Sequence, residues 1–344
     1  MKVMKEKCLT LIKNIFVQKN WLPNDFGLMN GQAGIAMFLY FYSKIMQDKK
    51  AEKTADKIID TLWTYQLYEM SPNFYSGTTG IVWAINHLAD YEFLDLNEEQ
   101  FIRTTIYKVI QQKFETPTQI DLNSSLFSNG LFLLKQIKNE ESTSEYSVKE
   151  NLIYQVDECE RILLGTAYIQ ICNPPLSLTL LNSIFYFLIE VHKQKLYPCK
   201  TQKLLQLFPS FTDKIYSSDS FSEVITFQRL LFSLKDINFS MMSKFDMEAL
   251  NTYIAKLIPK GKIAIVSELS KAGIYSLLYD NHQLFNDCFL RLIQHDSSLW
   301  QQISQVLEEI KHKGIAINNL FGLGYGLLFF ENEYTNAIIQ QYEK

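Results

Sequence analysis

A short pattern recurs along most of this chain: one glycine, or two glycines three residues apart, directly before a run of apolar residues. The clearest copies are GQAG before IAMFLYFY and GTTG before IVWAINHL, and later copies keep only the second glycine. Consecutive copies lie about 45 to 55 residues apart, a period typical of repeat architectures. The glycines of the pattern are Gly31, Gly34, Gly77, Gly80, Gly130, Gly273 and Gly326.

Two kinds of helical segment alternate along the chain. Ala55–Tyr65, Ile102–Val109 and Ile303–Ile310 carry apolar residues on one face only, whereas Ile35–Tyr42 and Ile184–Val191 are apolar all round. Helices that are apolar on every side belong in the interior. The 13 glycines and 8 prolines are too few for the many turns of an all-β fold. The sequence therefore predicts an all-α fold, with outer amphipathic helices around inner buried ones.

The repeat also predicts where the helix pairs begin. The interval from Ser183 to Gly273 is about twice the period, so we expect an eroded copy within Ser222–Leu231 and about seven helix pairs in all. Each glycine would lie at the N-terminus of an inner helix, where the missing Cβ allows close backbone approach and leaves helix N–H groups free for other partners. The polar segment Lys138–Glu150 predicts an exposed loop. We expect residues 1–344 to form a single domain.

Composition excludes several classes of protein. The 33 basic and 37 acidic residues give a net charge of −4, which argues against nucleic-acid binding. No apolar stretch has the length of a transmembrane helix, and the first 16 residues predict an amphipathic helix instead of a signal peptide. The five cysteines are scattered without a CxxC pair, which favours a reducing compartment. We expect a cytoplasmic protein.

The units GLMNGQAGIAMFLY and YSGTTGIVWAI resemble those of the lanthionine synthetase C-like proteins, which include the lantibiotic cyclases. The resemblance implies an α/α toroid of seven units, with the glycine turns at one rim of a central cavity. It also implies a role in modifying a ribosomally made peptide, with the precursor peptide or a partner modification enzyme as the binding partner. The family's cyclases bind a zinc ion that activates a substrate cysteine thiol for addition to a dehydrated residue.

This chain departs from the family at the zinc ligands. The family's cysteine before the sixth glycine turn falls on Glu268, and its Cys-His pair before the seventh falls on Phe321 and Gly322. A further family histidine falls on Thr179. We therefore expect no zinc or other cofactor, and a catalytically degenerate toroid that binds a peptide or partner. The candidate cavity-rim residues are Asn30, Gln32, Ser76, Thr78 and Tyr325.

Three alternatives remain open from the residues alone. Displaced zinc ligands could come from His282, Cys288 and His295, although their spacing is not that of a usual zinc site. A filled structural scaffold is also compatible with the aromatic-rich sequence. A glycoside hydrolase would need a pair of carboxylates, for which the candidates are Asp121, Asp213, Glu268 and Asp280.

One further pair of residues has two interpretations. Trp83 and His87 lie four residues apart on a predicted inner helix, so they share one face. They could face the cavity, although a histidine within an apolar helix is more often part of the core.

Overall fold

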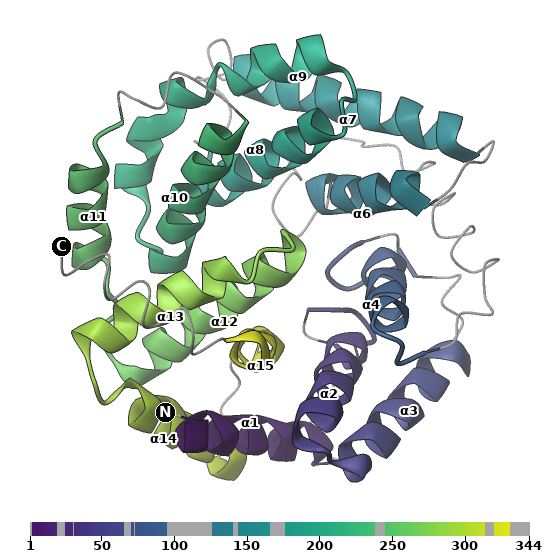
Figure 1. Ribbon diagram of the computed structural model, residues 1–344, viewed down its shortest axis with the longest axis vertical. Helices are drawn as coiled ribbons and strands as arrows, with labels where there is room; N and C mark the ends of the chain where they lie inside the picture. The colour runs from purple at the N-terminus through teal and green to yellow at the C-terminus, as the bar shows by residue number, and fades with distance from the viewer. Residues whose placement is uncertain are drawn as a thin grey trace. The chain divides into compact units, whose positions relative to one another are not determined.

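The computed structural model is built of helices throughout the part of the chain that it describes (Figure 1). The described residues contain no strand, so the all-α prediction is confirmed. The helical architecture is consistent with an α/α toroid. The structure describes residues 2–18, 25–29, 31–64, 70–71, 73–94, 126–139, 144–165, 176–237, 245–313 and 320–330.

The first of two compact units comprises residues 1–65, 220–225 and 254–344. Its closest helix pairs are α12 with α15, α2 with α3, and α1 with α14. Segments from both ends of the sequence therefore share one core. Its helices are α1 (Lys2–Val17), α2 (Gln32–Met46), α3 (Lys49–Thr64), α12 (Lys262–Leu278), α13 (Gln283–His295), α14 (Leu299–Lys313) and α15 (Leu320–Phe329).

The second unit comprises residues 66–219 and 226–253. Within it α6 packs on both α7 and α8, and α8 packs on α9. Its helices are α4 (Thr78–Asp90), α6 (Leu126–Asn139), α7 (Ser144–Gly165), α8 (Leu178–Lys193), α9 (Pro198–Leu205) and the 3-10 helix η5 (Phe208–Ser217). Two further helices, α10 (Phe221–Asp236) and α11 (Met247–Lys256), have residues in both units.

The predicted alternation of inner and outer helices is confirmed where the structure describes it. Every residue of α2 from Ala33 to Ser43 is buried, as are most residues of α4, α8 and α15. By contrast, α3 buries the predicted stripe from Ala55 to Leu62 and exposes its charged face. The stripe at Ile102–Val109 lies outside the described residues. The expected eroded copy at Ser222–Leu231 lies in α10, which is largely buried.

The predicted exposed loop at Lys138–Glu150 is wrong for most of its length. Helix α6 continues to Asn139, and α7 begins at Ser144. The polar composition of the segment conceals the start of an amphipathic helix, because Val148 and Leu152 are buried one turn apart.

Three of the predicted glycine turns also lie elsewhere than expected. Gly31 and Gly77 are the N-cap residues of α2 and α4, as the pattern predicts. Gly273 and Gly326, however, lie well inside α12 and α15, and Gly130 lies in the second turn of α6. At these positions the glycine allows two helices to pack closely, and it does not mark where a helix begins.

The contact between α12 and α15 is a contact between two backbones. A Cβ on Gly273 would lie 1.8 Å from the carbonyl oxygen of Gly322, and a Cβ on Gly322 would lie 2.2 Å from the carbonyl oxygen of Ser270. Aromatic rings fill the space beside other glycines of the unit. A Cβ on Gly326 would lie 2.1 Å from the ring of Phe285, and one on Gly34 would lie 3.1 Å from the ring of Phe321. Side chains larger than hydrogen at these glycines would force the helices apart.

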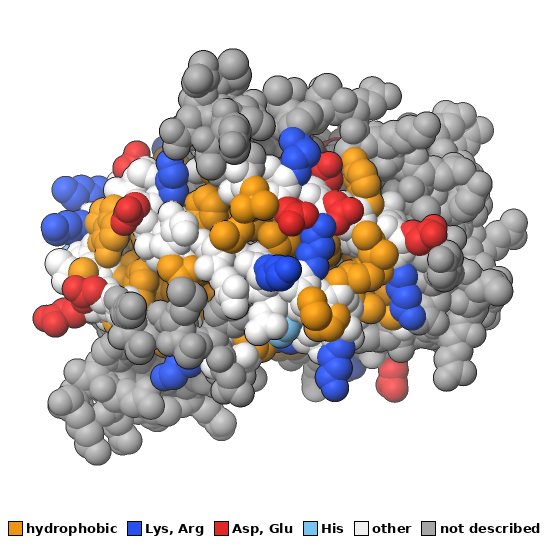
Figure 2. Space-filling view, turned by 90° about the horizontal axis from the view of Figure 1, so that it is seen from above, with side chains coloured by type: hydrophobic (Ala, Val, Ile, Leu, Met, Phe, Trp, Pro, Cys, Tyr) orange, Lys and Arg blue, Asp and Glu red, His pale blue; other side chains and the backbone are white. Residues whose placement is uncertain are grey.

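Helix length and surface charge bear on the membrane-protein and nucleic-acid-binding classes considered in the sequence analysis. In the described part of the chain, no helix has both the length and the apolar character needed to cross a membrane. On the face shown in Figure 2, acidic and basic side chains are interspersed among apolar ones. The opposite charges pair directly in places, as where Lys200 on α9 contacts Glu160 on α7 at 2.6 Å.

We expect Gly273→Ala to destabilise the protein, because the added methyl group would overlap the Gly322 carbonyl. The free energy of unfolding should fall by about 2–3 kcal/mol, the upper part of the range for overpacked cores. Urea unfolding followed by circular dichroism measures this change. The control is Ala264→Gly at an exposed position of the same helix, where only helix propensity changes, by about 1 kcal/mol. A Gly273→Ala protein as stable as the parent would contradict the backbone contact.

Candidate functional site

The loop before α2 folds back over the start of the helix. The backbone N–H of Gln32 donates to the carbonyl oxygen of Asp25 at 2.9 Å, and the Asp25 carboxylate accepts from the N–H of Gly27 at 2.7 Å. A Cβ on Gly31 would lie 2.4 Å from the oxygen and 2.5 Å from the nitrogen of Gly27. Gly31 is therefore required because the chain crosses directly over it.

The loop before α4 has the same construction. The N–H of Thr78 donates to the carbonyl oxygen of Ser71 at 3.0 Å, which is the same step along the chain as from Gln32 to Asp25. A Cβ on Gly77 would lie 2.0 Å from that oxygen and 2.6 Å from the nitrogen of Asn73. The Asn73 side chain accepts from the N–H groups of Tyr75 and Ser76 at 2.7 and 3.1 Å. The two clearest sequence repeats are thus also repeats in hydrogen bonding.

These loops use helix N–H groups that the sequence left free. An exposed helix start can bind a ligand through its unpaired N–H groups, but here the chain's own carbonyls accept from Gln32 and Thr78. At both turns the first N–H group of the helix is therefore not available to another partner. Gly31 and Gly77 instead allow the loops to lie directly against the starts of the two helices.

The predicted rim residues differ in accessibility. Ser76 is exposed and Gln32 is half-buried, so both stay candidates for contact with a ligand. Thr78 and Tyr325 are each 1% exposed, so neither side chain reaches the surface, and a rim role for them stays a prediction. Asn30 lies outside the described residues.

The positions that would carry the family's zinc ligands have structural roles here. Phe321 and Gly322 lie in α15, where Phe321 packs against Gly34 and Gly322 against α12. Thr179 is buried in the first turn of α8, and its carbonyl oxygen accepts from the Ser183 hydroxyl. A phenyl ring and a glycine offer no metal ligand, so these residues do not fit the family's zinc site. That the protein works without zinc stays a prediction.

Glu268 on α12 anchors the start of α10. One of its carboxylate oxygens accepts from the backbone N–H and the hydroxyl of Ser222, both at 2.8 Å, and from the hydroxyl of Ser220 at 3.1 Å. The other oxygen accepts from Lys271 at 2.8 Å. Burial would raise the pKa of Glu268, but Lys271 and Ser222 outweigh it, and the pKa is lowered. Glu268 is a satisfied structural carboxylate in place of the family's cysteine.

His282, Cys288 and His295 are not brought together as a metal site. His282 is the N-cap of α13 and His295 its last residue, so their backbones lie about 20 Å apart along the helix. The ring of His282 stacks on Phe329 at 4.5 Å, and Cys288 is buried. Among the described residues, no group of three or more His, Cys, Asp or Glu side chains could hold a metal ion.

Within the first unit, the candidate carboxylates Glu268 and Asp280 do not form the pair that the glycosidase interpretation requires. Glu268 lies within α12, and Asp280 follows the C-terminal end of that helix. Their backbones are therefore about 15 Å or more apart along the helix axis. Hydrolases need a separation of about 5 to 9.5 Å. Asp213 is exposed on η5 of the other unit, and Asp121 lies outside the described residues.

Trp83 and His87 share one face of α4, as their spacing predicts. Their rings stack at 4.8 Å, and they are 5% and 7% exposed, so the core interpretation fits both. Lys135 on α6 lies over the Trp83 ring at 5.0 Å, which adds a cation–π contact.

The buried thiols are poor candidates for nucleophiles, because the thiolate is the reactive form. Burial raises the pKa of Cys8 to about 12 and the pKa of Cys159 well above its ordinary value. Cys288 is likewise buried and Cys199 is exposed, and none of these four cysteines forms a disulfide in the described part of the chain.

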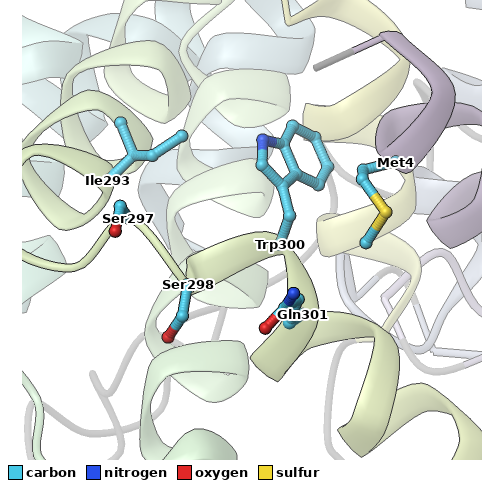
Figure 3. A pocket seen from close by; sticks show the side chains of 6 residues that line it. All are labelled: Met4, Ile293, Ser297, Ser298, Trp300 and Gln301. Atoms are coloured by element: carbon cyan, nitrogen blue, oxygen red, sulfur yellow. The ribbon is translucent and has the colours of Figure 1, made fainter.

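One hollow in the first unit was not predicted from the sequence. It has a volume of about 400 Å³ and opens between the start of α1, the end of α13 and the start of α14 (Figure 3). Its lining comes from Met4 and from the stretch 293–301, which joins α13 to α14 and carries no motif. The lining residues are Met4, Ile293, Ser297, Ser298, Trp300 and Gln301.

Comparisons with known proteins agree with the repeat. Residues 22–165 match the family described as lanthionine synthetase C-like protein. This segment contains both duplicated loops and the helices α2 to α7 that follow them. The resemblance drawn from the glycine motifs is thereby confirmed. No curated protein and no solved structure matches the chain.

We expect Gly77→Ala to loosen the loop before α4. The backbone of Gly77 has φ −113° and ψ −167°, which suit any residue, so the effect would be purely steric. The free energy of unfolding should fall by about 1–3 kcal/mol, and the amide of Thr78 should exchange faster with solvent. Hydrogen exchange measures the second effect. The control is Ser76→Ala at the neighbouring exposed position, which should change the free energy of unfolding by less than about 0.5 kcal/mol. Equal changes in stability and in Thr78 exchange for the two variants would contradict a loop that passes directly over Gly77.

A second prediction concerns pH. Because the folded-state pKa of Glu268 is lowered, its contribution to stability is present above the unfolded pKa and is lost as pH falls through the folded pKa. Glu268→Gln should cost about 1.5–3 kcal/mol at pH 7, through weaker hydrogen bonds to Ser222, and should flatten the loss of stability below about pH 5. Urea titrations at pH 7 and pH 4 test this.

The matched control for Glu268→Gln is Glu309→Gln. Glu309 forms an exposed ion pair with Lys313 on α14, which should contribute less than about 1 kcal/mol. If both variants have the same small effect at pH 7, Glu268 does not anchor α10.

Proposed function

Because residues 22–165 match the lanthionine synthetase C-like family, we propose that the protein acts in the modification of a ribosomally made peptide, as a metal-free toroid that binds the peptide or its modifying enzyme. In this proposal the protein retains the family's scaffold and has lost the zinc-dependent step. The cytoplasm is the proposed location, because the four described cysteines are free thiols and nascent peptides are modified there.

The observation that carries the proposal is the fate of the zinc-ligand positions. Phe321 and Gly322 are both buried and close-packed against α2 and α12. Restoring a cysteine and a histidine there would place a side chain where Gly322 meets the backbone of Ser270. The loss of ligands is therefore built into the packing of the first unit, and reversal would need movement of α15.

In this proposal, binding is the part of the family's role that the protein keeps. The two duplicated loops place the exposed Ser76 and the half-buried Gln32 at helix starts, each supported by a loop that its own hydrogen bonds fix. Fixed polar side chains are suited to hydrogen-bonding an extended peptide. The alternative enzymes have less support, because Glu268 and Asp280 are far apart and His282 and His295 lie at opposite ends of α13.

The test uses the purified full chain and a fluorescently labelled peptide that contains both a dehydroalanine and a cysteine. Anisotropy reports binding, and alkylation of the remaining thiol reports thioether formation, which leaves the peptide mass unchanged. We expect saturable binding with no loss of free thiol, whether or not zinc is added. Elemental analysis of the protein should find no stoichiometric zinc. Thiol loss that requires both the protein and zinc would overturn the proposal, as would the absence of any binding.

The predicted rim is tested in the same assay. Gln32→Ala and Ser76→Ala should each weaken peptide binding by about three- to ten-fold, the loss of one hydrogen bond. The control is Gln202→Ala, which removes an exposed glutamine on α9. Weakening by the control to the same extent would show that the rim is not the binding surface.

A further inference from the structure

Helix α3 carries a row of lysines on its exposed face. Lys49, Lys50, Lys53 and Lys57 are all exposed, and their spacing of three and four residues places them along one side of the helix. Lys49, Lys53 and Lys57 follow one another at intervals of about 6 Å along the axis. Within the described part of the chain, none of these lysines forms an ion pair. These four residues form the lysine row.

The lysine row is unfavourable for the helix that carries it. The N-terminus is the positive end of a helix dipole and favours acidic residues, but Lys49 and Lys50 are the first residues of α3. Lysines four residues apart, such as Lys49 and Lys53, also repel each other. By contrast, α14 places opposite charges at this spacing, with Glu309 and Lys313 3.8 Å apart. A charge pattern that opposes local stability is expected where the charges serve binding.

The backbone N–H groups at the start of α3 are already used. The Asp48 carboxylate accepts from the N–H of Lys50 at 2.9 Å and from the N–H of Ala51 at 3.2 Å. The same carboxylate pairs with Lys13 on α1 at 3.1 Å. An anionic partner would therefore meet the lysine side chains of the row, and not the N–H groups of the helix.

An acidic row beside the lysines limits the width of a partner. Glu52, Asp56 and Asp60 each follow a lysine by three residues, which turns them by about 60° around the axis. They lie toward α2, where Asp56 accepts from the Tyr40 hydroxyl at 2.7 Å. A flat anionic membrane or a nucleic acid would meet both rows, whereas a single peptide chain can follow the lysines alone. Alternate side chains of an extended peptide lie about 6.6 Å apart, close to the lysine spacing.

We propose that the lysine row of α3 binds an acidic segment of a peptide partner, in an extended conformation with Asp or Glu at alternate residues. Three carboxylates of the segment pair with Lys49, Lys53 and Lys57, and Lys50 adds positive potential beside them. The net charge of −4 disfavours the same segment over the rest of the surface. The inference rests on the proposed peptide-binding function and assigns to it a binding surface and a charge requirement.

The test extends the labelled peptide that contains dehydroalanine and cysteine by the segment Ser-Asp-Ser-Asp-Ser-Asp. The comparison peptide carries Ser-Asn-Ser-Asn-Ser-Asn instead. At about 50 mM salt, anisotropy should give a Kd about ten-fold lower for the acidic extension, the gain expected of three exposed ion pairs. At about 0.5 M salt the gain should fall below about two-fold, because exposed charges are screened.

Charge-reversal variants locate the contact. Lys53→Glu combined with Lys57→Glu should remove the ten-fold gain. The control combines Lys203→Glu with Lys235→Glu at exposed positions of α9 and α10, which changes the net charge equally and should keep the gain. Lys49→Glu should lower the gain about three-fold, the loss of one pair. The same variant should raise the urea midpoint of unfolding, because it places an acid at the helix start and four residues before Lys53.

Several outcomes would overturn the inference. Equal Kd values for the Asp and Asn extensions would do so, as would the same loss of gain in the control variant. Phosphatidylserine vesicles that sediment the parent, but not the Lys53→Glu, Lys57→Glu variant, would assign the row to a membrane if the acidic extension also gives no gain. If the unextended peptide binds and the acidic extension adds nothing, only this inference is wrong. If neither peptide binds, the proposed function fails with it. Binding of the acidic peptide alone, lost in the double variant, would support the lysine row without the proposed function.

Discussion

The close contact between α12 and α15 is the constraint on which the first unit depends. Gly273 and Gly322 bring two helix backbones together with no side chain between them. Because α15 also packs on α1 and α2, its position determines where Phe321 meets Gly34 and where Lys5 meets Phe330. The same contact removes the family's metal-ligand positions from any accessible surface. Two positions that correspond to zinc ligands in the family, Phe321 and Gly322, thus serve packing in this chain.

Glycine has two separate uses in the repeat. At Gly31 and Gly77 it lets a loop cross over the start of a helix, so that the first N–H group of the helix donates to a carbonyl oxygen of the loop. At Gly273 it lets a second helix approach. Where glycine is missing, another device starts the helix: α8 uses the Ser177 hydroxyl, and α10 uses the Glu268 carboxylate. A weak sequence copy is therefore compatible with a well-formed helix.

The sequence predicted the helices better than the site. All-apolar runs identified α2, α4 and α8 because burial on every side leaves a direct trace in composition. The start of α7 was missed because its buried residues, Val148 and Leu152, are separated by polar ones. Gly273 was placed at a helix start because spacing along the chain cannot distinguish a turn from a helix crossing. The hollow at Trp300 was not predictable, since it depends on the packing of α1 against the connection between α13 and α14.

The bond from Lys5 to the Phe330 carbonyl joins residues far apart in sequence. The first unit therefore has a core made of its earliest and latest described helices, with the second unit's residues intervening between them in the chain. Such contacts close long loops and are formed slowly. During synthesis, the apolar faces of α1 and α2 that pack on α15 would stay exposed until α15 leaves the ribosome. This topology therefore requires that those apolar faces be protected from aggregation until synthesis is complete.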